Sequence, residues 1–269
     1  MENILLPTTI EFRETDNQNV GKMVVTPCHQ GYGTTLGNAL RRVLLSSLPG
    51  AAVESIKIKG VQHEFSALDG VQEDVIEIIL NIKHLAVKSF SSEPVVLSLT
   101  KKGKGEVTAA DFDKNSDIEI VSPDLKICTV TDDNFVFDMD ITINQGRGYV
   151  AVAEKETKNL DLGTIAIDSL YTPIRDVGYN VENTRVGDVT DYEKLTLVIE
   201  TNGTITPRAA VAQATKILMD HFTLILEQTG ASDRSSEKQG ADASPEEEAK
   251  SKKPKTKKKS TKKKKEDKK

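Results

Sequence analysis

The sequence contains no tryptophan, and only 4% of its 269 residues are aromatic. Aromatic platforms on which nucleic-acid bases could stack are therefore scarce. The two cysteines, Cys28 and Cys128, lie in no Cys-x-x-Cys pair and beside no histidine at metal-ligand spacing, so we expect reduced structural thiols in a cytosolic protein. The sequence also has no run of about 18 apolar residues and no basic and apolar leader at its start. We therefore expect no contact with a membrane.

Motifs for phosphate, metal or nucleophilic chemistry are missing as well. The glycine-rich phosphate-binding signatures do not occur, and the four histidines never take H-x-x-x-H spacing. Asp138 and Asp140 place two carboxylates on one face of an expected strand, but alternation with apolar neighbours favours a solvated face. The sequence thus predicts no catalytic residue, cofactor, metal or small-molecule ligand for this chain. A serine, histidine and aspartate brought together by folding would leave no such signature, so an unrecognised enzyme stays an alternative.

Charge is divided unevenly along the chain. Residues 231–269 contain 15 Lys and Arg against 8 Asp and Glu, a net charge of +7, which leaves −12 on residues 1–230. An acidic body is a poor match for a broad nucleic-acid-binding face. We interpret residues 231–249 as a flexible linker and residues 250–269 as a disordered Lys-rich tail. The tail either contacts nucleic-acid phosphates without reading sequence or is solvated with no dedicated partner. The residues that would contact phosphates are Lys257, Lys258, Lys259, Lys262, Lys263, Lys264 and Lys265.

The most informative stretch is GYGTTLGNALRRVLLSS, at residues 31–47. Its pattern predicts a helix over 34–47, capped by Thr34. One stripe of that helix is apolar or small and consists of Leu36, Ala39, Leu40, Val43, Leu44 and Ser47. The residues off the stripe are Asn38, Arg41 and Arg42, with Leu45 beside them. Guanidinium groups form bidentate bonds, so this outward face suits a protein partner, although a merely solvated amphipathic helix has the same pattern.

Patterns elsewhere predict mostly strands, which together with the helices indicate an α+β fold. The expected strands cover residues 8–14, 20–26, 51–59, 95–100, 118–121, 125–130, 135–143, 163–170, 177–181 and 195–201, with a loop at 150–162. A second helix is expected at 73–84, with its buried side formed by Val75, Ile76, Ile79, Leu80 and Lys83.

A third and longer helix is expected near the end of the folded part. Thr206 is a suitable N-cap, Pro207 suits the first helical position, and the pattern continues to about Gln228, with Gly230 as a stop. This helix is apolar on two sides. One stripe is Val211, Ala214, Leu218, Phe222 and Ile225, and the other is Ala210, Ile217 and Leu224. Both sides could pack into one core, or one side could bind a second copy of the chain.

Several segments resemble one protein family. The stretch 31–53, GYGTTLGNALRRVLLSSLPGAAV, is similar to the signature of the bacterial RNA polymerase alpha subunit. Further similar segments follow in the family's order, namely GVQEDVIEIILNIKHLAV at 70–87, VTAADF at 107–112, GRGYV at 146–150 and ETNGTITP at 200–207. Five ordered matches are far more specific than a single short motif.

The resemblance implies a two-part fold and a homodimer. A dimerisation subdomain would consist of residues 1–49 and 171–230, and a β-rich inserted subdomain of residues 50–170. The first and last long helices would form the dimer contact. The implied dimer residues are Tyr32, Leu36, Leu40, Leu218, Phe222 and Ile225.

The resemblance also implies a non-catalytic role, in which the dimer is the platform for the large beta and beta-prime subunits, with omega and sigma in the assembled enzyme. Nucleotidyl transfer and its Mg²⁺ would belong to the large subunits, and the location would be the cytoplasm, associated with the nucleoid. Implied beta contacts are Asn38, Arg41, Arg42, Leu45, Val71, Glu73 and Asp74. Implied beta-prime contacts are Lys83, Ile167 and Asp168.

The chain departs from the family pattern in two places. Cys28, His29 and Gln30 stand where most members have a Glu-Arg pair before the first signature glycine. Most members also carry a folded DNA-binding domain beyond the linker, for which 39 residues after Gly230 are too few. We therefore expect no promoter or activator recognition of that kind. A stand-alone, non-specific nucleic-acid-binding protein that acts through the Lys-rich tail is the alternative to the polymerase subunit.

Overall fold

The computed structural model describes residues 4–15, 17–155, 161–187 and 189–229. The chain divides into two compact units at Leu224, and the described part of the second unit, residues 225–229, is considered by itself as the end of the last helix. The predicted linker, the Lys-rich tail and the expected stop at Gly230 lie outside the described residues.

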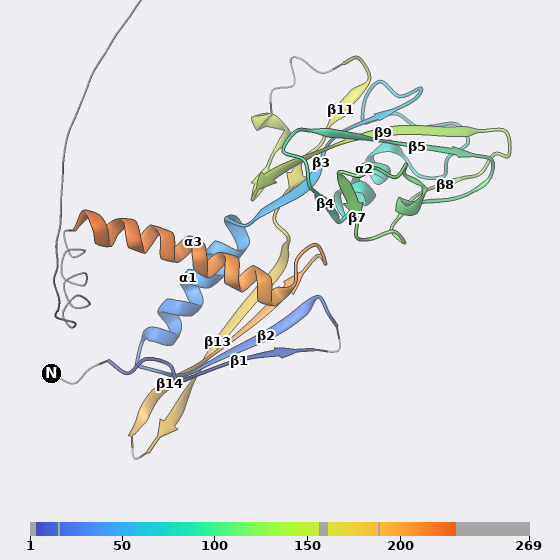
Figure 1. The fold of residues 1–269 in the computed structure, drawn as a ribbon. Helices are drawn as coiled ribbons and strands as arrows, with labels where there is room; N and C mark the ends of the chain where they lie inside the picture. The colour runs from blue at the N-terminus through green and yellow to red at the C-terminus, as the bar shows by residue number, and fades with distance from the viewer. Residues whose placement is uncertain (1–3, 16, 156–160, 188, 230–269) are drawn as a thin grey trace, which may run out of the picture. The chain divides into compact units, whose positions relative to one another are not determined.

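The beginning and the end of the folded chain meet in one antiparallel sheet. Its strands are β1 (Thr9–Glu14), β2 (Val20–Cys28), β13 (Ile174–Val186) and β14 (Val189–Thr201). They take the order β1-β2-β14-β13, so that β2 pairs with a strand some 170 positions further along the chain (Figure 1). The register places Met23 opposite Leu197 and Val25 opposite Leu195. All four side chains are buried on the face that the helices cover.

Two helices pack on this sheet, α1 (Tyr32–Ser46) and α3 (Pro207–Gln228). The inward side of α1 consists of Gly33, Gly37, Leu40 and Leu44. Only the first half of α3 is buried, through Pro207, Ala210 and Ala214. Together with the sheet they enclose one hydrophobic cluster from residues 23–48 and 174–214.

A second, larger hydrophobic cluster lies within residues 53–167. Its main sheet has the order β5-β9-β3-β4-β7, with β11 also paired to β3. The strands are β3 (Pro49–Ile58), β4 (Val87–Ser89), β5 (Val95–Lys102), β7 (Ile118–Ile120), β9 (Val136–Arg147) and β11 (Thr164–Ala166). Smaller pairs join β6 (Gly105–Thr108) to β8 (Lys126–Val130) and β10 (Tyr149–Val150) to β12 (Ser169–Leu170).

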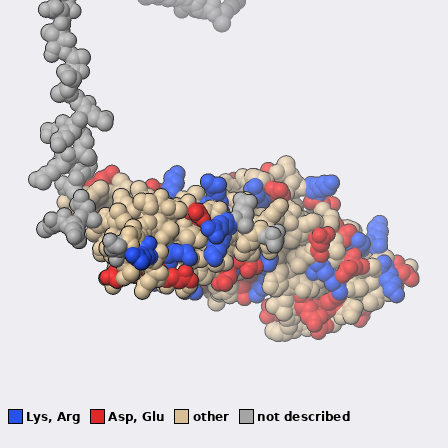
Figure 2. Space-filling view, turned by 90° about the horizontal axis from the view of Figure 1, so that it is seen from below, with Lys and Arg blue, Asp and Glu red and all other residues tan. Residues whose placement is uncertain are grey.

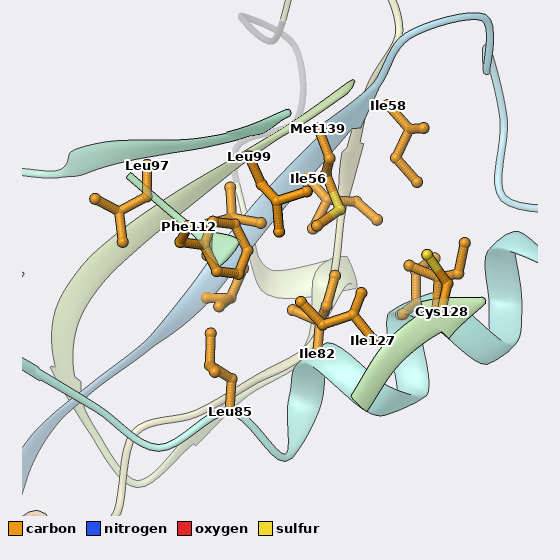
Figure 3. Close-up of a cluster of buried hydrophobic side chains, with 14 of the residues drawn as sticks. Ile56, Ile58, Ile82, Leu85, Leu97, Leu99, Phe112, Ile127, Cys128 and Met139 are labelled. Carbon is orange, nitrogen blue, oxygen red and sulfur yellow. The ribbon is translucent and has the colours of Figure 1, made fainter. Parts of the chain in front are cut away.

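Helix α2 (Val75–Lys83) closes this cluster, and Figure 3 shows Ile82 from the helix and Ile127 from β8 among its buried side chains. Short 3-10 turns, η1 (Ala109–Asp111) and η2 (Val152–Glu154), connect strands. The apolar interior is closely shielded from solvent, since Ile56, Leu99 and Met139 are all at most 1% exposed. The predicted α+β fold is confirmed by the mixture of antiparallel sheets and three α-helices that the described residues form.

The structure corrects three details of the predicted elements. The inward side of α2 consists of Val75, Ile78, Ile79 and Ile82, whereas Ile76 and Leu80 are 42% and 51% exposed. The expected strand at 163–170 is broken into β11 and β12, and the expected loop at 150–162 contains η2. The last two strands run far beyond the predicted bounds, because their hairpin continues past the apolar stretch through polar residues.

Candidate protein-interaction site

The outward face of α1 carries exposed polar groups. Asn38, Arg41 and Arg42 are all exposed, and within the described part of the chain neither guanidinium group has a hydrogen-bond or ion-pair partner. Five N–H donors on each arginine are therefore free to bind a carboxylate from another molecule. Leu45, predicted on the same face, is instead half-buried against the cluster beneath α1. The reason is that α1 approaches the sheet through Gly33 and Gly37, which rotates its inward side away from the predicted stripe.

The beginning of α1 is held by a residue from the other end of the sequence. The carboxylate of Glu193 on β14 accepts hydrogen bonds from the backbone N–H groups of Gly31 (2.8 Å) and Gly33 (2.9 Å). The predicted cap by Thr34 is wrong, since α1 begins at Tyr32 after Gly31 and no side chain of the cap residue itself caps the helix. Sequence reasoning missed Glu193 because its partners lie about 160 positions away.

An apolar surface remains uncovered at the other helix. The exposed large apolar side chains of α3, each between 53% and 60% exposed, are Met219, Phe222 and Leu224 and, in the part that belongs to the second compact unit, Ile225 and Leu226. On α1, Tyr32 and Leu36 are 43% and 37% exposed. Of the remaining predicted dimer residues, Leu40 is buried in the protomer's own core and Leu218 is half-buried against it. Leu40 thus faces the sheet, and within the first compact unit the uncovered apolar side chains are Tyr32, Leu36, Met219, Phe222 and Leu224.

The other residues predicted to contact the beta subunit lie near the start of α2 and differ in how exposed they are. Val71 is half-buried and bridges to Val130. Glu73 is occupied within the chain, because its carboxylate accepts bonds from Thr129 N (2.6 Å), Thr129 Oγ1 (3.0 Å) and Lys126 Nζ (3.0 Å). Burial favours a raised pKa for Glu73, but these hydrogen bonds together outweigh it and hold the pKa below its ordinary value. Asp74 is exposed and makes no side-chain cap.

Of the three residues predicted to contact the beta-prime subunit, two are partly exposed and one is buried. Lys83 Nζ and Asp168 Oδ2 form an ion pair at 2.9 Å, and Asp168 Oδ1 accepts a bond from Val152 N at 3.0 Å. The bond from Lys83 is the main cause of a lowered pKa at Asp168. Ile167 is 2% exposed in the larger core, so it cannot touch a partner. Ile167 and Asp168 lie in the short link between β11 and β12, where the apolar side chain enters the core and the carboxylate stays at the surface.

Lys155 lies beside this ion pair and was missed by sequence reasoning, which predicted a loop there. Its ammonium group donates to Glu54 O (3.1 Å), Ile167 O (2.5 Å) and Ser169 Oγ (2.6 Å). Desolvation is the main influence on its pKa and lowers it from the ordinary value. The three bonds use all the donors of the ammonium, so Lys155 joins β3 to the segment before β12 instead of presenting a charge to a partner.

The described residues offer no constellation for metal chemistry, since no group of three or more His, Cys, Asp and Glu among them could hold an ion. Of the described helices, none combines the length and apolar character needed to cross a bilayer. Both cysteines are buried, and burial raises the pKa of Cys128 to about 12, which keeps it a protonated thiol. On the face drawn in Figure 2, acidic and basic side chains are interspersed and do not gather into a basic surface.

Free guanidinium groups on one helix and an uncovered apolar end on another are typical of proteins that act by binding other proteins. Comparison with known sequences gives the particular family. The family model described as the RNA polymerase Rpb3/RpoA insert domain matches residues 56–172. A DNA-directed RNA polymerase subunit alpha of Clostridium botulinum (strain Eklund 17B) is 52% identical over 215 residues, which cover 80% of this chain and 68% of the relative. The subunit of the same name from Clostridium kluyveri is 52% identical over 218 residues, covering 81% and 69%. The chain belongs to the bacterial RNA polymerase alpha subunit family.

Proposed function

We propose that this chain serves DNA-directed RNA polymerase as a non-catalytic alpha subunit. In this role it homodimerises and forms the platform on which the beta and beta-prime subunits assemble, with omega and sigma joining the completed enzyme. The observation that carries the proposal is the identity of 52% over 215 residues to relatives named as this subunit. Nucleotidyl transfer and its Mg²⁺ then belong to the large subunits, and the chain works in the cytoplasm, associated with the nucleoid.

The homodimer is supported by the uncovered apolar side chains of α3 and α1. Phe222 and Ile225 are both large apolar side chains and are 60% and 58% exposed. Exposing apolar groups of this size costs free energy, since full burial of such a side chain stabilises by about 1.5–3 kcal/mol. If a second copy presents the same surface about a two-fold axis, the exposed apolar side chains of both copies become covered in one interface.

The beta contact is proposed on the outward face of α1. In the described part of the chain, Asn38, Arg41 and Arg42 are exposed there with no side-chain partner, and the exposed carboxylate of Asp74 lies at the start of α2. Leu45 is half-buried against the cluster beneath α1, and the carboxylate of Glu73 is bonded to Thr129, so both are less available to a partner than the exposed residues. For the beta-prime contact, Lys83 and Asp168 present an ion pair whose members are 31% and 33% exposed.

A separate proposal concerns the function of the Lys-rich tail, residues 250–269. It would bind nucleic-acid phosphates of the DNA that the polymerase holds, in a sequence-independent and salt-sensitive way. The stand-alone nucleic-acid-binding protein would need only this tail, whereas a chain whose relatives share residues over 80% of its length needs the folded body as well.

Copurification from the native cell tests the proposed function. The chain is tagged at its own locus, and the proteins that accompany it through a high-salt wash are identified by mass. Two very large subunits in a ratio of one each per two copies of the chain are expected. Recovery of the chain alone, or of nucleic acid without the large subunits, would contradict the proposal.

A further inference from the structure

Helix α1 lacks the capping groups that helices usually carry in their own sequence. Its first turn has no acidic residue, and its N-cap is Gly31, with φ of 83° and no side chain to accept a bond. The first N–H groups of a helix need acceptors from elsewhere. Both oxygens of Glu193 supply them, one to Gly31 and one to Gly33. A carboxylate at this end also interacts favourably with the positive end of the helix dipole.

The first two turns of α1 contribute no large side chain to the core. They face the sheet with Gly33 and Gly37, which bury no side chain, and larger inward side chains begin only at Leu40. The fit is close, because a Cβ on Gly33 would stand 2.7 Å from Glu193 Oε2 and one on Gly37 2.7 Å from the Tyr179 ring. The carboxylate therefore fixes one end of the helix, and the leucines fix the other.

We propose that Glu193 is a positioning residue for the homodimer contact, acting through the first two turns of α1. These turns carry Tyr32 and Leu36, the exposed apolar residues of this helix that are assigned to the contact. Arg41 and Arg42 lie one turn later, next to the leucine-anchored end, and depend on Glu193 much less. This inference rests on the proposed function, because it presumes that the chain dimerises through this surface.

The experiment compares three variants of the full chain by sedimentation equilibrium and by amide hydrogen exchange. Glu193→Ala removes both acceptors, and Glu193→Gln keeps one. Glu182→Gln is the matched control, because Glu182 lies in the same hairpin, is exposed and pairs with Lys194 at 3.1 Å. Hydrogen bonds to a charged group are stronger than neutral ones, so Glu193→Ala should weaken the dimer by about tenfold or more, with Glu193→Gln in between. The control should dimerise like the wild type.

Hydrogen exchange distinguishes positioning from general loss of stability. Residues 31–35 should exchange faster in Glu193→Ala, while β2 and β14 stay protected and capture of the beta subunit changes less than dimerisation. Unchanged dimer affinity despite faster exchange at 31–35 would overturn the inference, as would faster exchange across the whole sheet. A wild-type chain that stays monomeric would overturn the proposed dimer itself, which is a different result from a dimer that ignores Glu193.

Discussion

Arg42 is the side chain on which the proposed beta contact depends most. It is exposed on α1, and in the described part of the chain its guanidinium group has no internal partner. Arg42→Ala therefore breaks no bond within the protomer. Alanine is also a better helix former than arginine, so the free energy of unfolding should change by no more than about 0.5 kcal/mol.

Binding should respond differently. Truncating one member of a desolvated charged contact typically costs about 2–5 kcal/mol, which corresponds to a dissociation constant about 30-fold to about 4,000-fold higher. The assay is titration of the purified beta subunit onto the dimer, with the dimer's own dissociation constant measured in parallel. Dimerisation should be unchanged, because Arg42 lies on a different side of α1 from Tyr32 and Leu36, the residues of this helix that are assigned to the dimer contact.

A matched control is available in Arg208→Ala. Arg208 is also an exposed helical arginine, in the first turn of α3, and is not assigned to the contact. It should bind the beta subunit with wild-type affinity. If Arg42→Ala and Arg208→Ala bind equally well, the assignment of the α1 face is wrong, whatever the fate of the dimer.

Three further perturbations probe other parts of the molecule. Phe222→Asp places a charge on a side chain that is 60% exposed in the protomer, so it should leave folding intact but raise the dimer dissociation constant at least about tenfold, as sedimentation would detect. The ionised form of Glu73 stabilises the folded state above its ordinary pKa, and this contribution is lost as pH falls through the lower folded pKa. Glu73→Gln should therefore unfold at lower urea concentration at about pH 7 and show a flatter acid dependence; identical pH profiles would contradict this. Deleting residues 250–269 should weaken DNA binding by the assembled polymerase at low salt and reduce its salt dependence, and unchanged affinity would refute the phosphate contact.

Local signals in the sequence were sufficient to predict a helix whose cap residues and apolar stripe both lie within its own segment. The prediction for α3 agrees with its observed bounds, and Thr206 caps it through a bond from Ala209 N to its hydroxyl at 3.3 Å. The period-2 alternation of β9 likewise marks it clearly. Family resemblance added the order of the segments, which no pattern in a single segment contains.

Local signals failed where glycine or a distant residue sets the geometry. An apolar count treats Gly33 and Gly37 as neutral, yet they form the inward side of α1 and shift Leu36 outward. The helix α2 is apolar on too many sides for periodicity alone to choose between Ile76 and Ile78. The interior roles of Glu73 and Lys155 could not be predicted because their hydrogen-bond partners come from distant segments of the sequence.

The position of the exposed face of α1 depends on long-range contacts, which Gly33 and Gly37 make with the sheet. Glycine in a helix interior costs about 0.8–1.0 kcal/mol relative to alanine, so Gly37 weakens α1 as an isolated helix. The Cβ of an alanine at Gly37 would stand 3.0 Å from Leu195 and closer still to the Tyr179 ring, so either the ring or the helix would have to shift. Close approach to the sheet thus replaces intrinsic helix stability, and the sheet in turn fixes where Arg42 projects. A surface built in this way forms only when the first and last segments of the chain have paired.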